Sequence, residues 1–340
     1  MRRAASYPGR RRPPTGGHRS GRRTGDPQPV AREPDHMTTV EVSAPPRRRR
    51  PLIALTWASL ALAGITAIGL ATDPRVLTGA PIWLKPFKFA VSFALYAWTL
   101  DWLLSVLPRP GRLAGRAATT VVGASVIELA IIVVQAARGT TSHYNQTTPL
   151  DAALWSAMGM SVMVLSVAHL LIAVTALRRR IPDRAAAYAI RLGLLICLLG
   201  MLAAVPMTMR RTGVAGIVGA HSVGVPDGGP GMPLTGWSTT GGDLRIGHFV
   251  GLHALQVLPV LAYALARWAG HRVDRATQAR LVLVAGLAYG VLVPLLTWQA
   301  LRAQPLLRPD AATLLAFAAL AAATAAGIAT VLSRRPQALR

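Results

Sequence analysis

Cysteine, lysine and acidic side chains are scarce in this sequence. Its 340 residues include one cysteine, Cys197, so no disulfide can form within the chain. Lysine occurs only at Lys85 and Lys88. Charged residues make up 15% of the chain, whereas soluble domains average about 25%, and 52% of the residues are hydrophobic. Because these hydrophobic residues form long runs, the composition predicts a polytopic membrane protein.

Basic residues, in contrast, are abundant. The 37 Lys and Arg residues outnumber the 13 Asp and Glu residues and give a formal net charge of +24, which is also typical of nucleic-acid binding. The arginines lie between the hydrophobic runs, however, where they set the orientation of membrane spans. Neither a phosphate-binding loop nor a nucleic-acid motif is present. We therefore exclude nucleic acid as a partner and expect the lipid bilayer instead.

Eight hydrophobic segments each approach the ~20 residues that cross a bilayer as a helix. They lie at residues 52–71, 86–107, 117–137, 153–177, 185–206, 246–267, 280–301 and 311–333. The expected fold class is therefore all-α, a bundle of eight transmembrane helices within residues 51–335. Residues 1–50 are rich in Arg, Pro and Gly and are expected to be a disordered basic tail, with Met37 as a possible true start. Residues 336–340 form a short second tail.

The distribution of charge in the loops predicts the orientation of the bundle. The cluster Arg47–Arg50, the loops after the second, fourth and sixth segments and the residues after the eighth together carry twice as many Lys and Arg residues as the other loops. The positive-inside rule then places both termini in the cytoplasm, as an even number of spans also requires. The polar segments 72–89, 138–151 and 207–245 fall on the outer face. We thus expect a multi-pass protein of the plasma membrane whose site faces outward.

The densest group of chemically capable side chains lies in residues 219–259, a Gly/Pro-rich loop that runs into the sixth segment. His253 lies about 12 Å below the outer end of that segment, and Glu128 lies about 15 Å below the outer end of the third. Ionisable groups at such depth are functional candidates by default. We predict that His253 and Glu128 form a catalytic acid–base pair if their helices are neighbours. Purely structural pairing is the alternative.

Histidine is also the commonest ligand of transition metals. His143, His221, His248 and His253 are therefore candidate metal ligands, with a transition metal or haem as the possible cofactor. His248 and His253 diverge by about 140° around a helix, so they do not grip one ion together unless the helix is distorted. His169 stands alone in a hydrophobic run and is interpreted as a core histidine.

A second candidate site is basic. Lys85, Lys88 and Arg245 lie on the face that is expected to be poor in positive charge, and they are predicted to bind an anionic lipid or another small anionic ligand. Gln256, Gln135 and the single asparagine, Asn145, are further candidate ligand contacts. The alternative for the two lysines is interfacial anchoring, together with the neighbouring aromatic residues.

Three motifs, WLKPFKF, RGTTSHYN and GDLRIGHFVGLHALQ, resemble an uncharacterised group of multi-spanning bacterial membrane proteins. The Arg-rich, Lys-poor composition is similar to that of actinobacterial proteins. The resemblance covers about residues 50–335 and implies a multi-spanning fold, and it carries no activity with it.

Several function classes remain open from the sequence. We expect an integral membrane protein with a His/carboxylate site at the outer side that binds a metal or a small anionic ligand, with redox or hydrolytic chemistry possible there. A proton-coupled transporter, in which Glu128 and His253 carry the proton, is the first alternative. A structural or assembly protein without a small-molecule site is the second.

Overall fold

The computed structural model describes residues 50–270 and 272–334, all of which belong to one compact unit, Pro46–Arg340. The expectations for the basic N-terminal tail, for a start at Met37 and for residues 336–340 concern positions outside the described residues.

Eight helices in the described part are long and apolar enough to cross a membrane, which confirms the predicted fold class. They are α1 (Arg50–Thr72), α2 (Leu84–Val106), α3 (Gly111–Ala137), α4 (Pro149–Arg178), α5 (Arg184–Leu202), α7 (Arg245–Trp268), α8 (Arg275–Leu301) and α9 (Ala311–Ser333). The short helix α6 (Val205–Thr208) extends the fifth span after a turn.

Several helices begin earlier than their hydrophobic runs. The third begins at Gly111 rather than residue 117, and the seventh at Arg275 rather than residue 280. The side chain of Asp274 caps α8 by accepting hydrogen bonds from two backbone N–H groups of its first turn. The length of the apolar run therefore underestimates the length of these helices, because their first turns carry arginines at the expected level of the headgroups.

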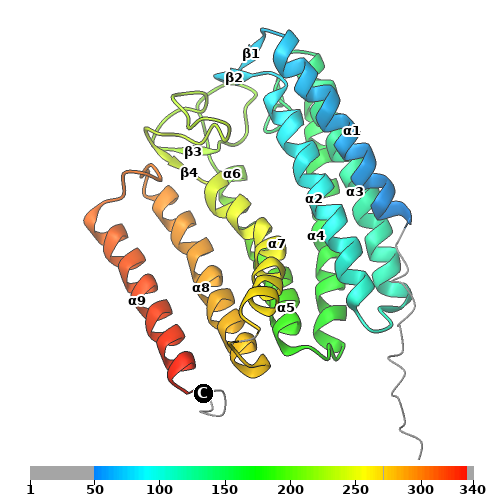
Figure 1. Cartoon of the computed structure of the whole chain (residues 1–340). Helices are drawn as coiled ribbons and strands as arrows, with labels where there is room; N and C mark the ends of the chain where they lie inside the picture. Colours follow the sequence, from blue (N-terminus) through cyan, green and yellow to red (C-terminus); the bar gives the residue numbers. More distant parts are fainter. Residues whose placement is uncertain (1–49, 271, 335–340) are drawn as a thin grey trace, which may run out of the picture. The chain divides into compact units, whose positions relative to one another are not determined.

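The helices form two groups (Figure 1). In one, α1 packs against α2 and α3, and α3 packs against α2 and α4. In the other, α5, α7 and α8 pack against one another, and α9 packs on α8. Contacts between α4 and α5 join the groups, and the largest hydrophobic core contains side chains from α1 through α5 and Leu255 of α7.

A cap of loops covers one end of the bundle (Figure 1). It contains two short antiparallel pairs, β1 (Val76–Leu77) with β2 (Ala80–Pro81) and β3 (Ser222–Val223) with β4 (Gly242–Asp243). We call residues 209–244 the lid. The lid is joined to the loop between α3 and α4 by the hydrogen bonds Val218 N to Tyr144 O and Gln146 N to Gly216 O. Both described chain ends lie at the opposite end of the bundle.

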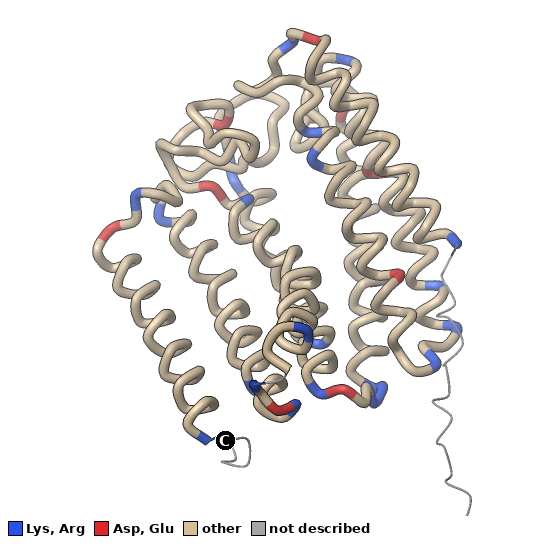
Figure 2. Tube along the Cα trace, in the orientation of Figure 1, with Lys and Arg blue, Asp and Glu red and all other residues tan. Residues whose placement is uncertain are grey.

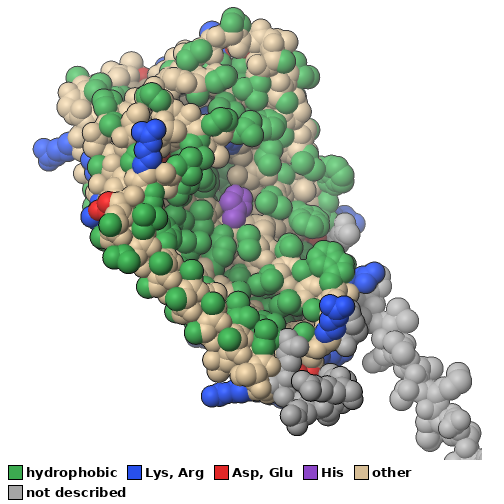
Figure 3. Space-filling view, turned by 60° about the vertical axis from the view of Figure 1, so that its left-hand side comes forward, with side chains coloured by type: hydrophobic (Ala, Val, Ile, Leu, Met, Phe, Trp, Pro, Cys, Tyr) green, Lys and Arg blue, Asp and Glu red, His purple; other side chains and the backbone are tan. Residues whose placement is uncertain are grey.

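The outer surface of the helices is suited to lipid. Figure 2 shows Lys, Arg, Asp and Glu gathered mainly at the two ends of the helices. Figure 3 shows a face covered with hydrophobic side chains around a hollow, at whose floor a histidine is visible. None of the 18 residues in the most hydrophobic window of α9 is buried by protein, so this helix meets the bilayer along most of its surface.

The backbones of α5 and α7 touch at two glycines. A Cβ added to Gly200 would lie 2.8 Å from the Cα of Gly251 and 2.6 Å from the nitrogen of Leu252. Small residues at such crossings let membrane helices approach closely. The absence of two side chains therefore sets the spacing of this helix pair.

We expect Gly200→Ala to lower the free energy of unfolding by about 1–3 kcal/mol, because the added methyl group forces the two backbones apart. The measurement is the apparent melting temperature of the purified protein in detergent. Gly123→Ala is the matched control, since no atom lies within 4 Å of the Cβ position there. Equal melting temperatures for the two variants would contradict the role of this contact.

Candidate functional site

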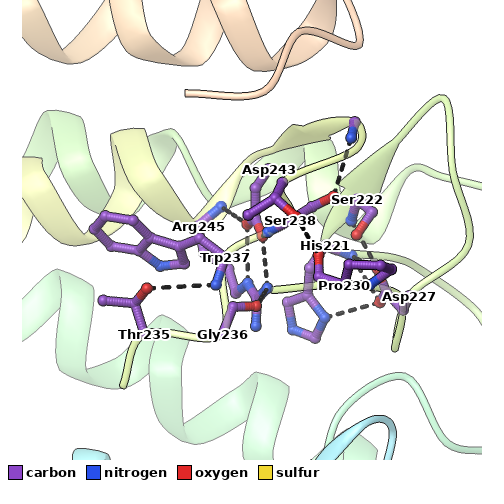
Figure 4. Close-up of polar contacts among 12 residues, drawn as sticks. His221, Ser222, Asp227, Pro230, Thr235, Gly236, Trp237, Ser238, Asp243 and Arg245 are labelled. Carbon is purple, nitrogen blue, oxygen red and sulfur yellow. Dashed lines mark hydrogen bonds and ion pairs between the residues drawn. The ribbon is translucent and has the colours of Figure 1, made fainter. Parts of the chain in front are cut away.

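The lid is fastened to the ends of α2 and α7 by charged side chains. Asp243 is fully buried and accepts hydrogen bonds from Arg245 Nε at 2.9 Å and Nη2 at 2.5 Å, and from the backbone nitrogen of Ser238 (Figure 4). Arg245 also donates to the carbonyl oxygen of Gly236 at 2.6 Å. From α2, Lys88 Nζ donates to the carbonyl oxygen of Thr235 at 2.8 Å. Two of the predicted anion contacts, Arg245 and Lys88, therefore hold the lid.

Lys85 differs from these two cations. It is partly buried at the first turn of α2, and no hydrogen bond or ion pair to its ammonium group exists among the described residues. Its charge is repelled by the cations Arg245 and Lys88 and attracted by the carboxylates Glu128 and Asp227. Neither carboxylate lies within ion-pair distance of its ammonium group. Among the described residues Lys85 is therefore a cation without a direct hydrogen-bond or ion-pair partner.

His221 and Asp227 form a close pair inside the lid (Figure 4). Nδ1 of His221 lies 2.8 Å from Oδ2 of Asp227, and the same carboxylate accepts the backbone N–H groups of His221 and Ser222. Burial on its own raises the pKa of the Asp227 carboxyl, but these hydrogen bonds hold that pKa below its usual range. Burial lowers the pKa of His221, despite the opposing effect of Asp227. A neutral imidazole beside a carboxylate results.

An aromatic cluster connects the loop between α3 and α4 with this pair. The ring of His143 lies 5.8 Å from the ring of Phe89 and 5.8 Å from that of Trp155. The ring of Tyr144 lies 5.2 Å from His221. Gly219, at φ +150°, lets the lid pass over Tyr144, since a Cβ there would lie 2.5 Å from the tyrosine ring.

Burial lowers the pKa of His143 well below its usual range, and electrostatic interactions with Lys85, His221 and His248 act in the same direction. Burial raises the pKa of the Tyr144 hydroxyl. His143 is therefore a neutral ring in an aromatic setting.

The remaining predicted metal ligands lie on α7. Nδ1 of His248 lies 2.8 Å from the carbonyl oxygen of Gly200 on α5. His253 is partly buried. Within residues 50–270 and 272–334, no group of three or more His, Cys, Asp or Glu side chains is arranged to hold a metal ion. The metal-ligand roles of His143, His221, His248 and His253, and a haem cofactor, therefore stay predictions.

Glu128 is 2% exposed and accepts a hydrogen bond from Ser161 of α4 at 3.1 Å. Its helix, α3, packs closely against α1, α2 and α4, whereas α7 packs closely against α5 and α8. The two helices thus do not form a closely packed pair, which was the stated condition for direct contact between Glu128 and His253. A shared catalytic role for the two residues stays a prediction.

Gln135 and Asn145 belong to a buried hydrogen-bond network at the lid end of α3 and α4. Asp151 accepts hydrogen bonds from Gln135 Nε2 at 2.9 Å and from Arg138 Nη1 at 2.8 Å. The side chain of Asn145 joins Thr140, Thr141 and Thr147 within one loop. These bonds occupy both amides, so they shape the loop that presents His143 and Tyr144.

A separate set of polar contacts crosses the bundle further from the lid. Gln256 Nε2 of α7 donates to Thr99 Oγ1 of α2 at 3.3 Å, and its buried Oε1 has no partner among the described residues. His169 is fully buried, with Nδ1 2.8 Å from Tyr96 Oη and Nε2 3.2 Å from the carbonyl oxygen of Leu194. The interpretation of His169 as a satisfied core histidine is confirmed.

Asp227, Tyr144 and Phe89 are site residues to which the sequence analysis assigned no role. Their types gave no signal, because an aspartate in a Gly/Pro-rich loop is ordinary turn chemistry. Only the fold of the lid brings Asp227 back onto His221, six residues earlier in the chain.

The protein should lose stability on mild acidification. Because burial holds the pKa of His143 below the ~6.5 of a free histidine, the unfolded chain takes up a proton first as the pH falls. Stability then decreases below about pH 6.5, by at most about 1.4 kcal/mol per pH unit for this group. We expect His143→Phe, measured by apparent melting temperature from pH 7.5 to 5, to flatten the decline. Trp155→Phe disturbs the same cluster without removing a titrating group and should keep the wild-type slope; identical slopes in all three proteins would refute the assignment.

Comparisons with known proteins do not assign this chain to a family. No protein-family model, no curated protein and no solved structure matches the chain. The resemblance to bacterial multi-spanning proteins therefore stays a prediction, and what stands is a polytopic membrane protein with eight candidate spans and a polar cluster beneath its lid.

Proposed function

We propose that this integral membrane protein binds a small oxyanion, such as a carboxylate or a phosphate, beneath the lid, with Lys85 as the central cation. One observation carries the proposal. Lys85 stands at the lid end of a spanning helix without a partner among the described residues, whereas Arg75, Arg138, Arg245 and Arg302 are each paired with an aspartate.

The energetics favour an anion at this position. A charged side chain in the span region costs on the order of 3 kcal/mol on insertion scales, and neighbouring cations add repulsion. Lys85 interacts electrostatically with both Lys88 and Arg245. A bound oxyanion offsets this repulsion and forms charge-assisted hydrogen bonds, which are stronger than neutral ones. Because Lys85 is partly buried, screening of its charge by water and salt is reduced.

Transport of the anion is the second candidate, and it has its own observation. Polar contacts continue along α2 beyond the lid, through Tyr96 and Thr99, and Thr99 meets Gln256 of α7. Lys85 and Thr99 are about 21 Å apart along the helix, against a hydrocarbon core of about 30 Å. Uptake of a bound anion into proteoliposomes distinguishes a transporter from a protein that only binds. Redox or hydrolytic chemistry at the site stays a prediction.

We expect Lys85→Gln to weaken the binding of inorganic phosphate at least tenfold, about 1.4 kcal/mol, because the central charge is lost. Isothermal titration calorimetry of the purified protein in a non-ionic detergent measures this. Arg180→Gln removes the same charge from the exposed loop after α4 and serves as the control. Phosphate affinity that is unchanged in Lys85→Gln would rule out the central role of this lysine.

We further propose that the lid faces outward from the plasma membrane. Because Cys197 is the only cysteine, its replacement by alanine leaves a background for single-cysteine labelling. In intact cells a membrane-impermeant maleimide should label Val214→Cys, in the lid, and should label Arg180→Cys only after lysis. The reverse pattern would place the lid in the cytoplasm.

A further inference from the structure

We infer that the ligand is an oxyanion that carries its own hydrogen-bond donor, such as a protonated phosphate, because two histidines at the lid end, His221 and His248, each present an acceptor nitrogen. This inference rests on the proposed function and narrows it to a class of ligand. The argument depends on the tautomer of each histidine, that is, on which of its two ring nitrogens carries the hydrogen.

The first histidine is His221. Its Nδ1 lies 2.8 Å from Oδ2 of Asp227, and that carboxylate already accepts two backbone N–H groups. An ionised carboxylate accepts hydrogen bonds and donates none, so the hydrogen of the neutral imidazole is on Nδ1. The other nitrogen, Nε2, therefore presents a lone pair, and it has no partner among the described residues.

The second histidine, His248, has the same tautomer for a separate reason. Its Nδ1 lies 2.8 Å from the carbonyl oxygen of Gly200, and a carbonyl oxygen is also only an acceptor. The hydrogen is again on Nδ1, and Nε2 presents a lone pair. The backbone contact between Gly200 and Gly251 fixes the carbonyl that orients this ring.

The two acceptors and the cation belong to one electrostatic neighbourhood. His221 interacts with Lys85 and Arg245, and His248 interacts with His221. His143 interacts with Lys85 and with both of these histidines. In geometric terms, the aromatic chain from Phe89 through His143 and Tyr144 to His221 links α2 with the lid.

Such a site distinguishes between anions of equal shape. A phosphate ion at neutral pH retains at least one P–OH group, which donates to an imidazole lone pair while Lys85 meets an anionic oxygen. Sulfate has the same tetrahedral form but no hydrogen, so its oxygens face the lone pairs of Nε2 and leave them unsatisfied. Sites built to bond a ligand hydrogen reject the analogue that lacks it.

Free phosphate and a singly protonated phosphomonoester lipid headgroup share this chemistry. The shared requirement is a phosphate with an ionisable P–OH.

The test is calorimetric titration of the full-length protein in dodecyl maltoside at pH 7.5 with sodium phosphate, sodium sulfate and dihexanoyl phosphatidate. We expect phosphate to bind at least tenfold more tightly than sulfate. Tighter binding of phosphatidate than of phosphate identifies a lipid source, and equal or weaker binding identifies the free ion; both uphold the inference. Equal affinities for phosphate and sulfate overturn it but leave anion binding in place. Binding of none of the three overturns the proposed function as well.

Asp227→Asn provides a second arm. The new amide can donate to Nδ1 of His221, which moves the imidazole hydrogen to Nε2 and turns the acceptor into a donor. The ratio of phosphate to sulfate affinity should then fall several-fold. Asp310→Asn, at the pair with Arg302, is the control and should keep the wild-type ratio. An unchanged ratio in folded Asp227→Asn protein overturns the role of His221, and if the variant does not fold, the wild-type titrations decide.

Discussion

The backbones of α5 and α7 touch at Gly200 and Gly251, with no side chain between them. This contact does more than pack two helices, because it places the carbonyl oxygen of Gly200 against Nδ1 of His248. It also fixes the start of α7, where Arg245 and Asp243 hold the lid. The attachment of the lid to α7 and the orientation of His248 therefore depend on the absence of two side chains.

The cations at the lid end differ in whether they have a partner within the protein. Arg245 and Lys88 have partners within the protein and serve to fix the lid, whereas Lys85 has none among the described residues. Asp227 fixes His221 in a similar way, since its carboxylate bonds both the ring and the backbone of the same residue. The residues that fix the lid are thus paired, whereas the ammonium group of Lys85 and the Nε2 atoms of His221 and His248 have no hydrogen-bond partner among the described residues.

Much of the architecture was predictable from local sequence. A hydrophobic run of about 20 residues has few alternatives to a membrane helix, so the eight spans were predicted correctly, except that α3 and α8 begin earlier. Concentration of polar side chains in residues 138–151 and 207–245 likewise indicated which end carries the cluster. The contact roles of Gln135 and Asn145 stay predictions, and the structure adds that Asp151 and three threonines form hydrogen bonds with these two amides.

The sequence by itself determined the fold class, the number of spans and the candidate residues, since these depend on the composition of each segment alone. Only the tertiary structure decided which candidates meet. It placed Asp227 on His221, kept α3 and α7 from packing closely, and left Lys85 unpaired within the part of the chain described. These outcomes depend on helix packing and on the path of the lid. Both arise from contacts between residues far apart in the chain. The hydropathy and residue spacing of a single segment contain no information about such contacts.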